Sequence, residues 1–234
     1  INEAAGALHP EPMARATREA GADLGIALDG DADRIVVADG EGRLLDGDDV
    51  LYLWTLEMIR EGRPPAAVVG TVMTNFGLER ALGALGVSLR RVPVGDRYVV
   101  TEMEASGALL GGEPSGHLIR ADLSTTGDGT LSGLHLAAFV ALSKTPLAAQ
   151  PRFPRTPQLL RNLRVRERVP VGDVPVLSGA IGRAEERLAG RGRVLVRWSG
   201  TEPLLRVMVE GEDAGLVAAL ADEIVSAARA ALGE

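Results

Sequence analysis

Three aspartates at alternate positions are the strongest candidates for chemistry in this sequence. Asp29, Asp31 and Asp33 follow directly on the apolar run Leu24–Leu28, and only small residues separate them. Because neighbouring carboxylates disfavour one another's ionisation, a loop that gathers three of them usually holds a cation. Carboxylate oxygens suit a hard ion such as magnesium, manganese or calcium. Arg34 comes next in the chain and can reach an anionic ligand.

Two other interpretations of the segment Asp29–Arg34 are weaker. A helix-loop-helix calcium loop also opens with Asp-x-Asp-x-Asp, but it needs glycine at its sixth position and an acidic residue at its twelfth. Arg34 and Gly40 occupy those positions here, and the expected flanking elements are strands. A solvated acidic turn is the remaining alternative, and three aspartates after a buried strand make it the minority interpretation.

A second polar segment, Gly-Gly-Glu-Pro-Ser-Gly-His, ends at His117. Glu113, Ser115 and His117 offer a carboxylate, a hydroxyl and an imidazole from a flexible backbone. Such groups suit sugar hydroxyls, and the histidine can contact phosphate or move protons. A glycine-rich turn with one exposed histidine is as often structural, so the residues alone leave both interpretations open.

A third segment has the composition of a phosphate site. Arg197 opens the run Arg-Trp-Ser-Gly-Thr-Glu-Pro, and Arg206 follows it. Two arginines can bind phosphate bidentately, and Ser199, Thr201 and the amide of Gly200 can donate further hydrogen bonds. The alternative is a polar hairpin connection with surface arginines.

Two further segments give weaker signals. Arg97 lies near a predicted helix start, a position suited to anions, although an ordinary cap followed by a surface arginine explains it as well. The run Ser-Thr-Thr-Gly-Asp-Gly at Ser124–Gly129 can bind anions through backbone amides, but such a run is more often a turn. His135 lies within an apolar helix pattern and is expected to be structural.

The elements that must position these residues alternate between strand and helix, which predicts an α/β fold. Leu24–Leu28 and Ile35–Ala38 are predicted to pair as a hairpin, so the aspartates lie at a strand's C-terminal end, where open α/β sheets bind ligands. Further helices are predicted over 12–20, from 46–49 through 59, around 78–85, over 95–106 and from 129 through 142, with strands over 66–73, 87–94 and 107–110.

The proline-rich segment 144–157 is predicted to be a linker. Beyond it, a strand at 159–169, a helix at 178–188, strands at 193–198 and 204–209 and a helix at 214–232 form a β-α-β-β-α unit. This unit is small enough to be a domain of its own.

Composition excludes several classes of protein. The 234 residues allow one large or two modest domains, and with 3% aromatics the cores must rest on Ala, Val and Leu. A net charge of -7 argues against a general nucleic-acid or membrane surface. The absence of cysteine excludes disulfides and thiol chemistry. No apolar run approaches the roughly 20 residues that span a bilayer. The first residues do not form a signal peptide and do not include an initiator methionine, which hints at a trimmed N-terminus.

The polar segments together are more specific than any one of them. Asp29–Arg34, Gly95–Tyr98, Gly112–His117 and Arg197–Pro203, in this order, resemble the α-D-phosphohexomutase family. Val-Met-Thr-Asn-Phe-Gly at 72–77, Val-Gly-Asp-Arg-Tyr-Val at 94–99 and the run at 124–129 are similar to its bacterial branch that acts on glucosamine phosphates. The resemblance runs along nearly the whole chain.

The resemblance implies a fold and a role for each candidate residue. The family has four α/β-type domains around a cleft. Here residues 1–46 would be the tail of the mixed-sheet second domain, 47–149 the α/β third domain, 150–158 a linker and 159–234 the mobile α+β fourth domain. The implied Mg²⁺ ligands are Asp29, Asp31 and Asp33; Arg34 and Arg97 contact substrate or phosphate; Glu113 and Ser115 bind sugar hydroxyls; His117 lies near the reacting end; Arg197, Ser199, Gly200, Thr201 and Arg206 grip the non-reacting phosphate.

The implied reaction moves a phosphoryl group between the 6- and 1-positions of a hexosamine, through a hexosamine 1,6-bisphosphate that turns over in the cleft. Converting glucosamine 6-phosphate to glucosamine 1-phosphate feeds amino-sugar nucleotide and peptidoglycan synthesis. The expected partner is a small sugar phosphate, with no nucleic acid or membrane, in the cytoplasm. The alternatives are a mannose or glucose phosphate mutase and a non-catalytic sugar-phosphate-binding module. The sequence does not determine the oligomeric state.

The sequence departs from the family in three places. The family's phosphoserine loop, Ser-His-Asn, occurs nowhere in it. That serine carries the phosphoryl group and completes the metal site, so this chain alone is predicted to be inactive as a mutase and to bind metal weakly. Pro114 stands where the branch usually has glutamine, in the sugar-binding loop, and Trp198 stands where proline is usual.

Overall fold

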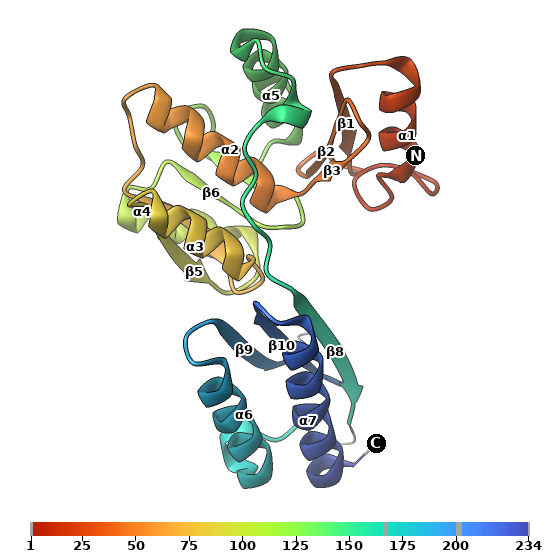
Figure 1. Cartoon of the computed structure of the whole chain (residues 1–234), viewed down its shortest axis with the longest axis vertical. Helices are drawn as coiled ribbons and strands as arrows, with labels where there is room; N and C mark the ends of the chain where they lie inside the picture. The colour runs from red at the N-terminus through yellow and green to blue at the C-terminus, as the bar shows by residue number, and fades with distance from the viewer. Residues whose placement is uncertain (1, 166–167, 200–202, 234) are drawn as a thin grey trace. The chain divides into compact units, whose positions relative to one another are not determined.

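A computed structural model describes residues 2–165, 168–199 and 203–233 of the chain and is drawn in Figure 1. The chain divides into two compact units, Ile1–Pro154 and Arg155–Glu234. Helices and strands alternate within both, which confirms the predicted α/β fold class. Among the described residues, no helix combines the length and the apolar composition needed to cross a membrane.

The first part of unit 1 is a small antiparallel sheet in the order β1-β2-β3, with α1 and the later helix α5 (Gly129–Ser143) against it. Its elements are α1 (Glu11–Ala20), β1 (Leu24–Leu28), β2 (Ile35–Asp39) and β3 (Leu44–Leu45). The predicted hairpin is confirmed: Leu28 pairs with Ile35, so residues 29–34 form the loop that closes it. We call these residues the aspartate loop. The short strand β3 is not predicted by the sequence.

The second part of unit 1 is a four-stranded sheet in the order β5-β4-β6-β7. The elements are α2 (Gly47–Arg60), β4 (Ala67–Thr71), α3 (Phe76–Ala84), β5 (Ser88–Val92), α4 (Asp96–Ser106), β6 (Leu110–Gly112), β7 (Leu118–Arg120) and α5 (Gly129–Ser143). Strand β4 runs parallel to both neighbours and is buried along its length, as expected for a central parallel strand. β7 is antiparallel to β6, so residues 113–117 form a tight hairpin loop.

Alternate residues of β4 face two different cores. Val68 packs with side chains of α2 and α3, whereas Val69 packs with Val99 and Met103 of α4. This two-sided burial follows from the period of two along a strand. Helix α2 begins at the predicted cap: the Asp46 side chain accepts from the amides of Asp48 and Asp49.

Unit 2 confirms the predicted β-α-β-β-α order. Its elements are β8 (Gln158–Arg164), α6 (Pro175–Leu188), β9 (Gly192–Trp198), β10 (Leu204–Gly211) and α7 (Ala214–Leu232), with the antiparallel sheet order β8-β10-β9. Leu205 and Val207 of β10 pack with Leu177 of α6 and Leu220 of α7. Strand β8 ends before the predicted Val169, and α6 begins before the predicted Ser178 because proline fits the first helical turn.

The predicted linker is not uniformly exposed. The proline-rich segment 144–157 contains a 3-10 turn, η1 (Leu147–Ala149), and its residues Leu147 and Phe153 are buried in the core of unit 1. The division between the units follows Pro154. The domain boundaries predicted at residues 46, 149 and 158 stay predictions.

Candidate functional site

The aspartate loop gathers its three carboxylates. One carboxylate oxygen from each of Asp29, Asp31 and Asp33 lies within 4.8 Å of the others. Asp29 is buried, whereas Asp31 is exposed. Ala32, between Asp31 and Asp33, has φ 61°, a left-handed conformation that curls the loop and costs an alanine about 1–2 kcal/mol. The residues predicted to bind metal therefore converge within one turn of backbone.

Arg34 and burial set the charges of the aspartate loop. The Arg34 backbone amide donates to Asp29 Oδ1 at 3.1 Å, and its Nε donates to Oδ2 at 2.6 Å. Burial tends to raise the pKa of Asp29, but the hydrogen bonds and charge of Arg34 outweigh it and hold that pKa below the ordinary value of 3.8. Burial, then the carboxylates of Asp29 and Asp31, raise the pKa of Asp33. A cation would relieve this repulsion, so the residues fit a hard divalent ion.

The hairpin loop between β6 and β7, residues 113–117, lies against the aspartate loop. We call it the His117 loop. The Ile35 amide donates to the Gly116 carbonyl at 3.1 Å, and Arg34 forms a β-bridge with His117. Gly116 has φ +94, and a Cβ there would overlap the Ile35 carbonyl oxygen, so the approach requires glycine. The structure thus places next to each other two motifs that are far apart in sequence.

His117 is buried beside the aspartates. Its Nε2 lies 3.8 Å from Asp33 Oδ2, and the residue is 6% exposed. The structural interpretation of this glycine-rich turn assumed an exposed histidine, and that assumption is wrong for His117. The imidazole lies at the edge of the candidate metal site, where it can contact an anionic ligand.

Glu113 connects the His117 loop to the start of α4. Its Oε1 accepts from the Gly95 amide at 2.7 Å, and its Oε2 accepts from the Ser115 hydroxyl at 3.1 Å. The carboxylate and hydroxyl predicted to bind a sugar are thus within hydrogen-bond distance of each other. The same hydrogen bond brings the segment that carries Arg97 to this loop.

Arg97 is held by the residue that follows it. Its guanidinium lies 4.5 Å from the centre of the Tyr98 ring and donates to the Tyr98 hydroxyl at 2.6 Å. Both side chains are exposed. No role for Tyr98 follows from the sequence alone, although an aromatic residue directly after an arginine is a signal that can indicate this contact.

In unit 2, the two predicted phosphate-binding arginines face each other across strands. Arg206 of β10 is the register partner of Arg197 of β9. Burial, and then the charge of Arg206, lower the pKa of Arg197. Ser199 is buried, and its amide donates to the Leu204 carbonyl at 2.8 Å. Gly200 and Thr201, the other predicted phosphate contacts, lie outside the described residues.

Trp198 has a structural explanation. Its indole packs against the core of unit 2, and its Nε1 donates to the Val169 carbonyl at 3.0 Å. The side chain therefore stabilises the unit and is directed to the opposite face of β9 from Arg197, since successive strand residues alternate.

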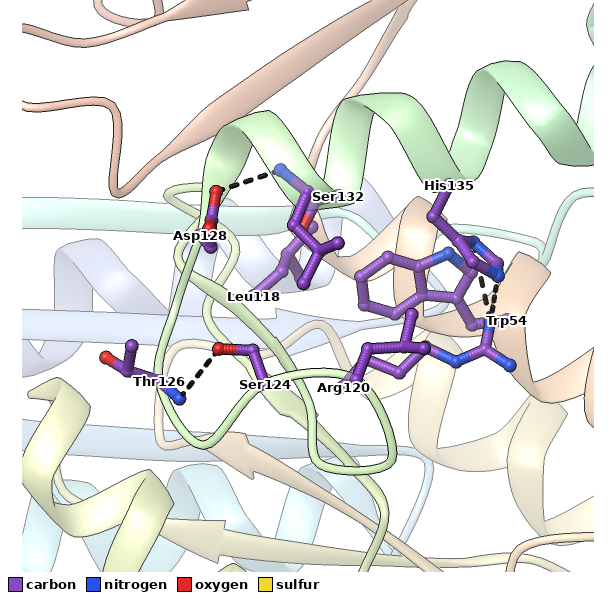
Figure 2. A pocket seen from close by; sticks show the side chains of 10 residues that line it. Trp54, Leu118, Arg120, Ser124, Thr126, Asp128, Ser132 and His135 are labelled. Atoms are coloured by element: carbon purple, nitrogen blue, oxygen red, sulfur yellow. Dashed lines mark hydrogen bonds between the residues drawn. The ribbon is translucent and has the colours of Figure 1, made fainter.

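A separate polar cluster surrounds Trp54 on α2 and is structural in character (Figure 2). The Arg120 guanidinium contacts His135 Nε2 at 2.6 Å and forms an ion pair with Glu57. Burial, then the positive charge of Arg120, lower the pKa of His135. The cavity between these side chains is about 10 Å³, enough for one water molecule at most.

Comparison with known proteins gives matches along the whole chain. Residues 46–153 match the family model of the phosphoglucomutase/phosphomannomutase α/β/α domain III, and residues 160–227 match that of the C-terminal domain. Phosphoglucosamine mutase from Anaeromyxobacter dehalogenans is 50% identical over 100% of this chain and 51% of its own length. The enzyme of that name from Myxococcus xanthus is 48% identical over 99% of this chain and 51% of its own. The chain spans about half the length of these curated relatives.

Solved structures agree on the fold. A phosphoglucomutase/phosphomannomutase family protein from Burkholderia thailandensis matches with a TM-score of 0.75 and 23% identity, over 97% of this chain and 51% of that one. Aspergillus fumigatus N-acetylphosphoglucosamine mutase, solved with GlcNAc-6P and magnesium, matches with a TM-score of 0.73 and 21% identity, over 99% of this chain and 54% of that one.

Proposed function

This chain belongs to the phosphoglucomutase/phosphomannomutase family of α-D-phosphohexomutases, and from this premise we propose that it forms part of a phosphoglucosamine mutase. The proposed reaction converts glucosamine 6-phosphate to glucosamine 1-phosphate through a hexosamine 1,6-bisphosphate. One observation carries the proposal: relatives with that name are about half identical along the entire chain. The convergence of the aspartate loop, Arg34 and His117 supports it.

We propose that Asp29, Asp31 and Asp33 hold Mg²⁺, as their all-oxygen donor set favours. When bound, Mg²⁺ would supply positive charge that neutralises the transferring phosphoryl group. Arg34 orients Asp29 through two hydrogen bonds and adds a permanent positive charge beside the carboxylates. His117 places its Nε2 3.8 Å from Asp33 Oδ2, where it can donate to a phosphoryl oxygen or move a proton.

We propose that Glu113 and Ser115 bind sugar hydroxyls and that Arg97 contacts the substrate from the start of α4. The Glu113 carboxylate already accepts hydrogen bonds from Ser115 and from Gly95, which orients it before a ligand arrives. Preorganised donors and acceptors lower the cost of ordering on binding. Pro114 stands where the resemblance leads us to expect glutamine, and it has no backbone N–H to donate in this loop.

For the non-reacting phosphate we propose Arg197 and Arg206, together with Ser199, Gly200 and Thr201. Two guanidinium groups opposite each other on adjacent strands repel, and a phosphate between them turns that repulsion into two charge-assisted contacts. A clamp of this kind holds a phosphate without discriminating which carbon bears it. It therefore suits a substrate that must bind in two orientations.

We propose that the chain alone performs no mutase reaction, because no Ser-His-Asn loop occurs in its sequence. The test is a coupled mutase assay that compares the 234-residue chain with a fusion to the N-terminal half of the Anaeromyxobacter dehalogenans enzyme. We expect turnover of glucosamine 6-phosphate by the fusion and none by the chain. In the fusion, Asp31→Asn should lower kcat by about 100-fold, because an electrostatic contact to the transferring group is lost.

Three outcomes would change the proposal. Turnover by the chain alone would overturn its predicted inactivity. A fusion that prefers mannose or glucose 6-phosphate would overturn the assignment to glucosamine. The fusion could also be inactive while the folded chain still binds sugar phosphates, as measured by calorimetry. That result would support a non-catalytic binding module instead.

A further inference from the structure

We infer that the segment Ser124–Gly129, which we call the Gly127 loop, is a positioning element of the candidate site, and that Gly127 sets the place of the His117 ring. The loop connects β7 to α5 and carries no residue with a role in the proposed reaction. The inference rests on the proposed function for its chemical meaning. Its evidence is the packing of the loop against His117 and against the aspartate loop.

Gly127 lies directly against the imidazole of His117. A Cβ built on it would overlap Nε2 and Cε1 of the ring and come within 2.7 Å of Cδ2. Gly127 is not one of the described glycines with a positive φ, so its backbone would accept an L-residue. The requirement for glycine therefore comes from the ring and not from backbone strain.

Packing is what fixes the ring. His117 Nδ1 is buried and has no hydrogen-bond partner among the residues that the structure describes. Its Nε2 lies 3.8 Å from Asp33 Oδ2, beyond hydrogen-bond distance. With neither nitrogen fixed by a protein hydrogen bond, the orientation of the imidazole depends on the surfaces against its faces, and Gly127 is one of them.

The same loop also holds the aspartate loop. The Gly129 amide donates to the Ala32 carbonyl at 2.9 Å. A Cβ at Gly129 would lie 2.8 Å from the Arg34 carbonyl oxygen and 2.9 Å from that of Ala32. Gly129 thus fixes the backbone between Asp31 and Asp33, while Gly127 fixes the ring that faces them.

The Gly127 loop is itself anchored at both ends. At its start, the Ser124 amide donates to the Arg120 carbonyl at 2.9 Å, and the Ser124 hydroxyl accepts from Thr126 at 3.4 Å. At its end, Asp128 Oδ1 accepts from the Leu131 amide at 2.8 Å and caps α5. Figure 2 shows the Ser124 side chain turned toward Thr126 within the loop and the Asp128 side chain turned toward the first turn of α5. A supporting group that is rigid in this way transmits its position to the residues it touches.

The test is Gly127→Ala in the 234-residue chain, read by NMR and by Mn²⁺ binding. The chain has 3 histidines, so its imidazole Cε1–H signals are few and can be assigned by substitution. We expect Gly127→Ala to shift the His117 signal while the His135 signal stays in place. We also expect Mn²⁺ affinity to fall roughly tenfold, as is typical when the support of a metal site is disturbed.

Gly83→Ala is the matched control, because a Cβ at Gly83 in α3 meets nothing within 4 Å. It should change neither readout. The double variant Gly127→Ala with His117→Ala removes the ring that the new methyl displaces. If the effect passes through the ring, the double variant binds Mn²⁺ as His117→Ala does, and it regains any stability lost in Gly127→Ala.

An unmoved His117 signal in Gly127→Ala would overturn the inference. So would a shifted signal with unchanged Mn²⁺ affinity, since the ring would then be uncoupled from the aspartates. If Mn²⁺ binding by the wild-type chain is too weak to measure, as expected without the serine that completes the metal site, the His117 signal and the stability of the double variant decide the inference. Absence of turnover by the fusion concerns the proposed function alone.

Discussion

Arginines play opposite electrostatic roles in the two units. Arg34 neutralises Asp29, which burial would otherwise protonate more readily. Arg197 and Arg206 instead place two like charges opposite each other on adjacent strands. Like charges in this position repel. In the proposed function, the first pair belongs to the site for a cation and the second to the site for an anion.

We expect Arg206→Gln to weaken the binding of inorganic phosphate by unit 2 by roughly tenfold or more, because hydrogen bonds to charged groups contribute about 1.5–3 kcal/mol. The measurement is the phosphate-induced rise of the thermal unfolding temperature of the chain. Arg161→Gln is the control, since Arg161 pairs with the exposed Asp222. An equal loss in both variants would show that phosphate responds only to general charge.

At the scale of elements, two hairpins form the site by meeting through their backbones. The loop of β1–β2 carries the aspartates, the loop of β6–β7 carries His117, and the Ile35–Gly116 hydrogen bond joins them. A second backbone hydrogen bond, from the Gly47 amide of α2 to the Pro114 carbonyl, also holds the His117 loop. Glycines at these junctions allow the close approach.

We expect Gly116→Ala to lower the free energy of unfolding of the chain by about 2 kcal/mol more than Gly62→Ala does. Both glycines have a positive φ, so both variants incur the left-handed strain of about 1–2 kcal/mol. Only at Gly116 would the new methyl group also meet the Ile35 backbone, whereas at Gly62 it meets nothing within 4 Å. Urea unfolding measures the difference, and equal losses would refute a tight hairpin junction.

At the scale of the whole molecule, each unit has a core built from its own residues. The larger of the two cores described for unit 1 joins both of its sheets to α2, α3 and α5, and the core of unit 2 joins β8, β9 and β10 to α6 and α7. Each core contains fully buried leucines and valines, in keeping with the low aromatic content. A core of this kind favours independent folding.

We expect the isolated segment 155–234 to fold and to unfold cooperatively. Leu220→Ala in it should cost about 2–5 kcal/mol, because Leu220 of α7 is fully buried. Val176→Ala should change stability by no more than about 0.5 kcal/mol, since Val176 is 60% exposed. Circular dichroism during urea unfolding distinguishes the two variants; a segment without a cooperative transition would contradict the expectation.

The sequence by itself determined the features that depend on neighbours along the chain. Hydrophobic periodicity predicted the hairpin around the aspartates and the β-α-β-β-α order of unit 2, because period and turn residues are local properties. It missed the strands β3 and β7, which are two and three residues long and too short to show a period. It also treated the residues before Pro154 as linker, although Phe153 is buried.

Only the tertiary structure decided which distant residues meet. That the aspartate loop, Glu113 and His117 share one region depends on how the β1–β2 and β6–β7 hairpins pack, and no local pattern encodes that packing. For the same reason, the sequence does not predict the contact of Gly127 with His117. The Gly127 loop has the composition of an ordinary turn, and glycine is required there by an imidazole ring ten positions earlier in the chain. The spacing of residue types along the sequence indicated which chemical groups the candidate site contains. The packing of one backbone segment against another determined where those groups lie relative to one another.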